Sequence, residues 1–273
     1  MLNSVVKPRE RGTLQKLLGK EYFILKRKIS WAISQKHYAH CRDEGNTAHF
    51  SYIKHKTPLI RKLKDVDMQL QYNKVTNLKL AVQKINSIII YPGEVFSFWR
   101  LVGRPTKGKG YLDGMTLSNG QVGKGTGGGL CQLGNLIYWM ALHTPLTVKE
   151  RWRHSYDVFP DVNRKLPFGS GATLSYNYVD LQILNNTPDV FVLKFWFDEE
   201  NLNGEILADK ENIFRYEVFE TEHVMQQQWW GGYTRHNQIW RHKTNKVNHT
   251  MVTEFITENH AIMMYSPLLE AGK

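Results

Sequence analysis

The chain has 273 residues, of which 41% are hydrophobic and 12% aromatic, a composition that excludes a disordered protein and supplies a sizeable core. Its two cysteines are too few for a disulfide framework. Apolar runs fall short of the ~18 residues of a transmembrane helix, and the N-terminus lacks the apolar stretch of a secretory signal. The sequence therefore predicts a cytoplasmic protein. Its formal net charge of +11 favours anionic partners.

Residues 8–37 are predicted to form a basic helix in which apolar and cationic side chains alternate. A helix of this kind can lie on an anionic membrane surface, peripheral to the inner membrane face, and it can equally be a solvated helix docked on the main domain. Both interpretations stay open here. Nucleic-acid binding is less favoured, because the chain has no zinc-finger spacing, no RNA-binding strand motif and no convincing helix-turn-helix. The polar residues 41–57 are predicted to be irregular.

A second helix is predicted to begin after Asn77 as its N-cap, with one apolar face formed by Leu78, Ala81, Val82, Ile85 and Ile89. Pro92 and Gly93 would end it, and residues 94–99 read as a strand. A basic, glycine-rich loop follows over residues 103–114, with a strand expected at 115–118.

The most informative segment is Gly127–Leu133, with the sequence GGGLCQL. An apolar stripe of helical spacing begins immediately after it, at Leu133, Leu136, Ile137, Met140 and Ala141. Cys131 is thereby expected in the first helical turn, where the unsatisfied N–H groups and the helix dipole favour a thiolate. The glycines would leave room for a ligand. The same position can also bury the thiol as a small hydrophobe, and that alternative stays open.

Strands are predicted near residues 147–153, 172–176, 179–186, 190–197 and 204–208. Helices followed by strands predict an α+β fold with a mainly antiparallel sheet. The order Cys131, His154, Asp180 along a helix and then strands is that of papain-like and transglutaminase-like cysteine enzymes. In such a site Cys131 would be the nucleophile, His154 the base and Asp180 the orienting acid, with Gln132 as an oxyanion donor. The alternative is a core cysteine, an exposed histidine and a strand-edge aspartate.

Beyond residue 210 the pattern is less defined. Residues 212–222 and 252–256 are expected as strands, with a basic loop over 235–246 between them. The predicted organisation is a basic, partly helical extension over residues 1–69, an α+β domain over 70–210, and a C-terminal extension over 211–273. No metal site or cofactor is expected, because Cys131, His143 and His154 lack the spacing of zinc ligands.

Several of these segments together resemble the VanW family, which is named for an accessory protein of B-type vancomycin-resistance clusters. They are the block Tyr91–Phe98 (YPGEVFSF), Gly110–Gly114, Gly127–Asn135, His154, and the segment Asp180–Thr187. The resemblance covers roughly residues 77–209. Two positions depart from the family pattern: Gly134 stands where Ser or Thr is usual, and Gly171 where Asp is common.

The resemblance implies an accessory protein of cell-wall metabolism or of the response to glycopeptide antibiotics. The resemblance allows two versions of this function. In the first, the cysteine site is a hydrolase or acyltransferase that acts on a peptide-bearing cell-wall precursor. In the second, the chain is a non-catalytic module for an anionic ligand or a protein partner. The ligand-binding positions predicted at the helix start are Gly127, Gly128, Gly129 and Asn135.

Overall fold

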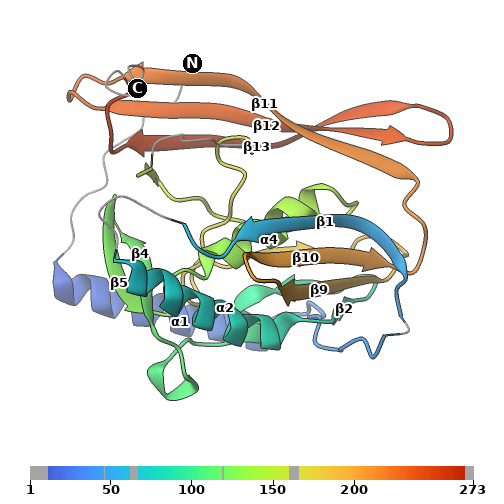
Figure 1. Cartoon of the computed structure of the whole chain (residues 1–273), viewed down its shortest axis with the longest axis horizontal. Coiled ribbons are helices and arrows are strands. Elements are labelled where there is room, and N and C mark those ends of the chain that lie inside the picture. Colours follow the sequence, from blue (N-terminus) through green and yellow to red (C-terminus); the bar gives the residue numbers. More distant parts are fainter. Residues whose placement is uncertain (1–11, 46, 62–66, 119, 160–165, 268–273) are drawn as a thin grey trace.

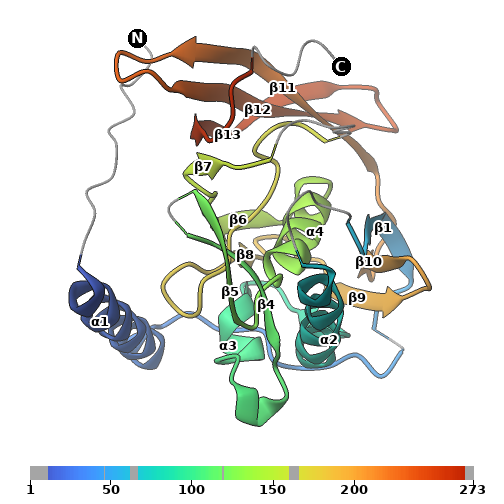
Figure 2. The ribbon, with the colours of Figure 1, turned by 60° about the vertical axis from the view of Figure 1, so that its left-hand side comes forward.

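We describe a computed structural model of the chain, which covers residues 12–45, 47–61, 67–118, 120–159 and 166–267. Its centre is an antiparallel sheet with the strand order β1 (Phe50–Pro58), β10 (Asn201–Ala208), β9 (Phe191–Phe197) and β2 (Ile88–Ile90). The helices α2 (Met68–Ile85) and α4 (Cys131–Leu142) pack on one face of this sheet (Figure 2). Helices and mainly antiparallel strands confirm the predicted α+β class.

The main core lies between this sheet and the two helices, because apolar residues alternate along β9 and β10 and point inward from one face. Gly204 of β10 is needed there, since a β-carbon would lie 2.7 Å from the terminal methyl of Met140 on α4. On the opposite face, a small apolar cluster covers one end of the strands. Its buried members are Ala48, which precedes β1, and Ile89, Val192 and Leu207 of β2, β9 and β10. The rest of that face stays open.

Smaller elements frame the helix α4. A second sheet has the order β3 (Val95–Ser97), β8 (Gln182–Leu184) and β6 (Thr147–Glu150), and the short helix α3 (Phe98–Val102) follows β3. The hairpin of β4 (Asp113–Ser118) and β5 (Gln121–Thr126) leads into α4. The single-turn helix η1 (Lys107–Lys109) precedes the hairpin.

A third sheet lies above the core and joins β11 (Phe214–Gln227), β12 (Tyr233–Asn245), β13 (Met251–Met263) and the two-residue β7 (Tyr156–Asp157) (Figure 1). The basic segment 235–246 is thus a strand, so the loop predicted there is wrong. The physical reason is long-range pairing: β12 is hydrogen-bonded along its length to both β11 and β13.

Three further assignments are corrected. Asn77 is not an N-cap; α2 begins nine residues earlier, where the Asp67 carboxylate accepts a hydrogen bond from the N–H of Gln69. Residues 50–58 are not irregular, because β1 pairs with β10 and so the N-terminal region contributes an edge strand to the central sheet. Residues 172–176 form no strand; a single bridge joins Ser175 to Val179.

The basic N-terminal segment forms α1 (Thr13–Ile33), which runs beside the body of the protein. In the described part of the chain, no helix combines the length and the apolar character needed to cross a membrane.

Candidate functional site

The glycine turn before α4 is a crossing point of two backbones. A β-carbon at Gly128 would lie 2.3 Å from the carbonyl carbon and oxygen of Gly114, and a β-carbon at Gly114 would lie 2.4 Å from the oxygen of Gly128. Asn77 is hydrogen-bonded to both crossing segments and stabilises them. Its side-chain amide donates to the carbonyls of Leu112 and Gly128 at 3.0 Å, and its side-chain oxygen accepts from the N–H of Leu112. This explains why a buried asparagine lies within α2 rather than at its start.

The neighbouring glycines are also packed by the chain itself. Gly127 and Gly129 have φ values of +77° and +92°, which favour glycine. β-Carbons there would lie 2.6 Å from Pro105 and 2.2 Å from the side chain of Lys74. The space that the sequence suggested for a ligand is therefore occupied by protein, although ligand binding at Gly127, Gly128 and Gly129 remains a prediction.

Lys74 is a feature of this site that the sequence analysis missed. It is a buried residue of α2, and its ammonium donates to the side-chain oxygen of Gln71 at 2.8 Å. Burial lowers the pKa of Lys74 to about 8, with a contribution from Arg61. The signal was present, because Gln71, Lys74 and Leu78 share one helical face once the helix is extended back to Met68.

Cys131 is the first residue of α4, as predicted. Its sulfur lies 3.4 Å from the nitrogen and 3.7 Å from the oxygen of Leu174, so the thiol accepts from the N–H and donates to the carbonyl. Burial raises the pKa of the Cys131 thiol, and the hydrogen bond from Leu174 opposes that rise only in part. These interactions attach residues 172–174 to the start of the helix.

The polar side chains near Cys131 are hydrogen-bonded to other parts of the chain. The amide of Gln132 donates to the carbonyl of Pro58 at 2.8 Å, at the end of β1. The amide oxygen of Asn135 accepts from the N–H of Ala172 at 2.7 Å. A β-carbon at Gly171 would lie 2.6 Å from that oxygen, which gives a local reason for glycine where the family pattern has Asp.

Gly134, the other departure from the family pattern, is packed against the segment that Cys131 holds. A β-carbon there would lie 2.9 Å from a terminal methyl of Leu174. Serine or threonine at this position would therefore require the Leu174 side chain to move.

Asp180 lies at a buried corner between β8 and α3. One carboxylate oxygen accepts from the hydroxyl of Ser97 at 2.6 Å and the other from the N–H of Trp99 at 3.0 Å. Burial raises the pKa of Asp180 to about 6, and the hydrogen bonds from Ser97 and Trp99 act in the opposite direction. The carboxylate thus caps the start of α3.

His154 lies between β6 and β7, and its pKa is lowered by burial and by the neighbouring Arg153. The nearby Thr173 N–H donates to the carbonyl of Trp152, while the next N–H, that of Leu174, donates to Cys131. The start of α4 at Cys131 and the segment before His154 are therefore both hydrogen-bonded to residues 173–174. Among the described residues, no hydrogen bond joins His154 to Cys131 or to Asp180, and the catalytic triad stays a prediction.

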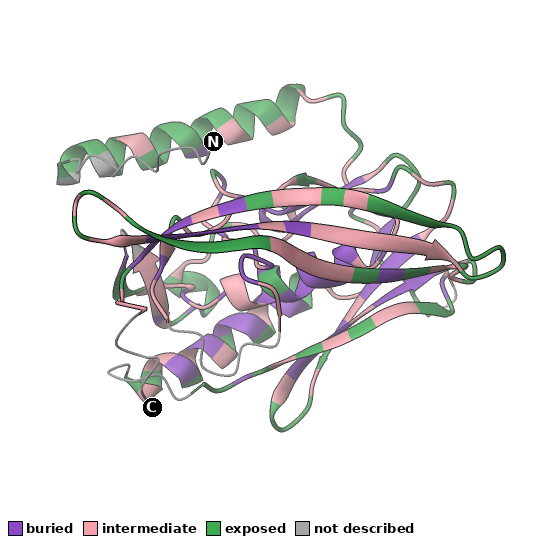
Figure 3. Ribbon diagram, turned by 90° about the horizontal axis from the view of Figure 1, so that it is seen from above, coloured by how far each residue is buried: buried purple, intermediate pink, exposed green. Residues whose placement is uncertain are grey.

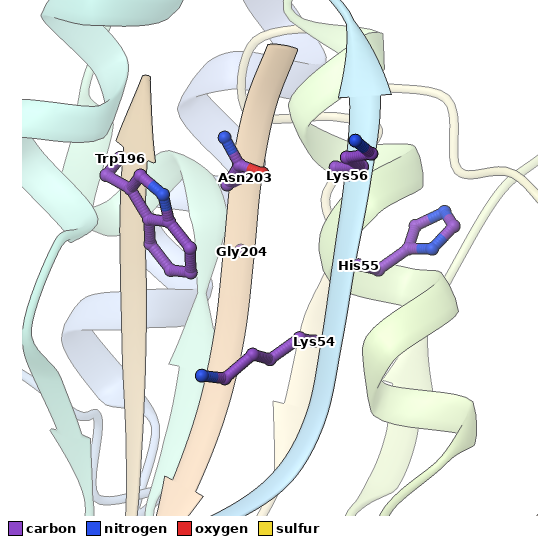
Figure 4. A pocket seen from close by; sticks show the side chains of 6 residues that line it. All are labelled: Lys54, His55, Lys56, Trp196, Asn203 and Gly204. Atoms are coloured by element: carbon purple, nitrogen blue, oxygen red, sulfur yellow. The ribbon is translucent and has the colours of Figure 1, made fainter. Parts of the chain in front are cut away.

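A shallow hollow of about 290 Å³ lies on the open face of the central sheet. The strand register places Lys56, Asn203 and Trp196 side by side across β1, β10 and β9, with Lys54, Glu205 and Lys194 in the next row. In Figure 4 Lys54 reaches over β10, whereas His55 points away, toward α4. We call Lys54, Lys56, Trp196 and Asn203 the open-face cluster. The sequence held a signal for Trp196, because side chains alternate between the two faces of a strand and residues 190–197 were predicted to form one.

The open-face cluster combines an aromatic ring with cations. The indole of Trp196 is 42% exposed. Lys54 forms a 3.3 Å ion pair with Glu205, a weak interaction because the lysine is largely exposed. Asn203 is buried and donates from its amide to Asp198 at 2.8 Å, which fixes its orientation.

Comparison with known proteins assigns the central part of the chain. Residues 73–207 match the family model described as VanW like protein. The chain is 42% identical over 152 residues to the vancomycin B-type resistance protein VanW of Enterococcus faecalis, which covers 56% of this chain and 55% of that protein. It is 31% identical over 109 residues to the uncharacterized protein YoaR of Bacillus subtilis, which covers 40% of this chain and 34% of the relative.

No solved structure matches the chain. The chain spans about half the length of the first of these relatives and a third of the second. The matched region contains most of α2, the glycine crossing, Cys131, the strand β9 and nearly all of β10. By this region, the chain belongs to the VanW family.

Proposed function

We propose that this protein is a cytoplasmic accessory protein of the response to glycopeptide antibiotics that binds an anionic cell-wall precursor without changing it chemically. The Enterococcus faecalis relative, a vancomycin B-type resistance protein, supports the context of vancomycin resistance. The observation that carries the binding role is the open-face cluster, in which Lys56, Asn203 and Trp196 line a hollow on the central sheet.

The chemistry of this cluster fits a ligand with both an anionic group and a ring. Lys54 and Lys56 supply ammonium groups for a phosphate or carboxylate. An exposed indole offers a flat apolar surface for a sugar or a base. A nucleotide-linked muramyl peptide carries both kinds of group, and the net charge of +11 assists its approach.

The surroundings of Cys131 support binding over catalysis. A nucleophilic thiol needs a lowered pKa or an adjacent base. Burial instead raises the pKa of the Cys131 thiol. Both hydrogen-bond partners of its sulfur are backbone atoms of Leu174. Gln132 and Asp180 likewise have structural partners. We infer that this site holds the fold together beside the ligand-binding sheet.

Isothermal titration with a nucleotide-linked muramyl pentapeptide tests the proposal. We expect binding by the full chain and a loss of at least about tenfold in affinity for Trp196→Ala and for Lys56→Ala, since stacking and charge-assisted contacts are each worth ~1–3 kcal/mol. Lys124→Ala removes the same charge from an exposed position on β5 and serves as the matched control. Equal affinity in all three variants, or no binding, would contradict the proposal.

The enzymatic alternative has a separate test. If Cys131 is a nucleophile, it should react with iodoacetamide near neutral pH faster than Cys41, the second free thiol. We expect Cys131 to react more slowly than Cys41, because its sulfur is hydrogen-bonded to the backbone of Leu174. Rapid alkylation of Cys131, identified by peptide mass spectrometry, would restore the enzymatic version.

A further inference from the structure

The helix α1 has two opposite faces, and one of them is attached to the body of the protein. Ile24 is buried, and the Arg27 guanidinium forms a bidentate ion pair with Glu150 at 2.5 and 2.7 Å. Arg27 also donates to the carbonyl of Asn177 at 2.6 Å, and Trp31 packs against the main core. With about 100° of rotation per residue, these three side chains define the docked face.

The other face carries an apolar stripe that no part of the described chain covers. Its members are between 51% and 77% exposed, and they are Leu14, Leu18, Tyr22, Leu25, Ile29 and Ile33. Their spacing of three or four residues places them within an arc of about 100° on the side away from the docked face. Figure 3 shows α1 mainly as exposed residues along one edge of the molecule.

The charges along α1 indicate what covers this stripe. Lys26 and Lys28 are exposed and border it on its two sides. Glu21 is the single acidic residue of Thr13–Ile33, and it forms an ion pair with Arg104 at 2.9 Å. The stripe is therefore framed by positive charge with no free carboxylate on the helix.

We propose that α1 docks this protein on an anionic membrane surface, with the apolar stripe in the lipid and Lys26 and Lys28 at the headgroups. Lysine stems lie along apolar surface while their ammonium groups stay in water, as this arrangement requires. A second copy of the chain fits less well, because two such helices would bring like charges together without the acidic partners that paired helices use.

The docked face fixes how the protein would sit. Because Ile24, Arg27 and Trp31 attach α1 to the body, the helix reaches the lipid as an ordered element and the domain stays on the aqueous side. This proposal does not depend on the ligand of the open-face cluster, since it involves different residues and different probes.

Vesicle sedimentation with the full chain tests it. We expect binding to vesicles of phosphatidylglycerol and phosphatidylcholine in about equal parts, and at least about tenfold weaker partitioning to phosphatidylcholine alone. Raising salt from about 0.05 M to about 0.5 M should weaken the anionic binding steeply, because charge interactions are then screened within a few ångströms.

Two variants separate the parts of the proposal. Leu18→Ser with Leu25→Ser should reduce partitioning at least about tenfold, and Lys26→Gln with Lys28→Gln should reduce it and flatten its salt dependence. The matched control is Val247→Ser with Met251→Ser, which removes exposed apolar side chains from the β12–β13 turn and from the first residue of β13. It should bind as the unmodified chain does. Circular dichroism confirms that each variant is folded.

Several results would overturn the proposal. They are equal binding to both kinds of vesicle, binding to neither, or an equal loss in the β12–β13 control. A dimer seen by light scattering without vesicle binding, and abolished by Leu18→Ser with Leu25→Ser, would instead make a second copy of the chain the occupant.

Discussion

Two opposing effects act on the thiol of Cys131. Its position at the start of α4 favours the thiolate through the helix dipole, while burial favours the neutral thiol, and the pKa is raised. The sequence predicted the first effect from the adjacent glycines and the apolar stripe. It left burial open as an alternative and could not decide for it, because the burial depends on Leu174, which is 43 residues away in the chain.

The hydrogen bonds of Cys131 make its role measurable as stability. Cys131→Ala leaves the N–H and the carbonyl of Leu174 without a partner, and we expect a loss of ~1–3 kcal/mol in the free energy of unfolding by urea. Cys131→Ser should cost less, because a hydroxyl can both donate and accept. Cys41→Ala is the control. An unchanged stability in Cys131→Ala would show that the thiol holds nothing in place.

Elements defined by local patterns were predicted better than elements defined by distant partners. The apolar stripe after Gly129 gave α4 correctly, because five apolar residues at helical spacing decide the buried face. Asn77 was misread as a helix start, since its bonds to Leu112 and Gly128 come from other elements. Strand β12 was missed for the same reason: the guanidinium of Arg241 is paired with Glu254 and bonded to the carbonyl of Leu142.

The candidate site shows the same division. The sequence located the start of α4 and Cys131 correctly, but it offered no means to foresee that Gly128 meets Gly114 or that Asp180 caps α3. The open-face cluster arises from the register of three strands, and the pairing of β1 with β10 joins residues far apart in the chain, such as Lys56 with Asn203. Local periodicity carries no information at that distance.

The crossing between the β4–β5 hairpin and the turn before α4 gives a prediction for these elements. Gly128→Ala would place a methyl group 2.3 Å from the backbone of Gly114, where no flexible side chain can move aside. We expect a loss of at least about 3 kcal/mol in the free energy of unfolding. Gly108→Ala is the matched control, because a β-carbon there meets nothing within 4 Å. Similar stabilities for the two variants would contradict this packing.

For the molecule as a whole, four histidines that are partly or fully buried predict loss of stability in acid. Burial lowers the pKa values of His55, His143, His154 and His236 in the folded protein. Below about pH 6.5, the unfolded chain binds protons at these positions and the folded chain does so only at lower pH. The free energy of unfolding measured in urea titrations should therefore fall as pH decreases from about 7.5 to about 5.5.

Asp180 contributes to the same profile with the opposite sign. Its pKa is raised to about 6 by burial, so the folded protein binds this proton before the unfolded chain, whose aspartate titrates near 3.9. This contribution increases stability as pH falls through about 6 and partly offsets the histidines. Asp180→Asn removes the offset, and we expect its stability to decline more steeply than that of the unmodified chain between about pH 7 and about pH 5. Parallel profiles would mean that Asp180 is already ionised throughout this range, held so by the hydrogen bonds from Ser97 and Trp99.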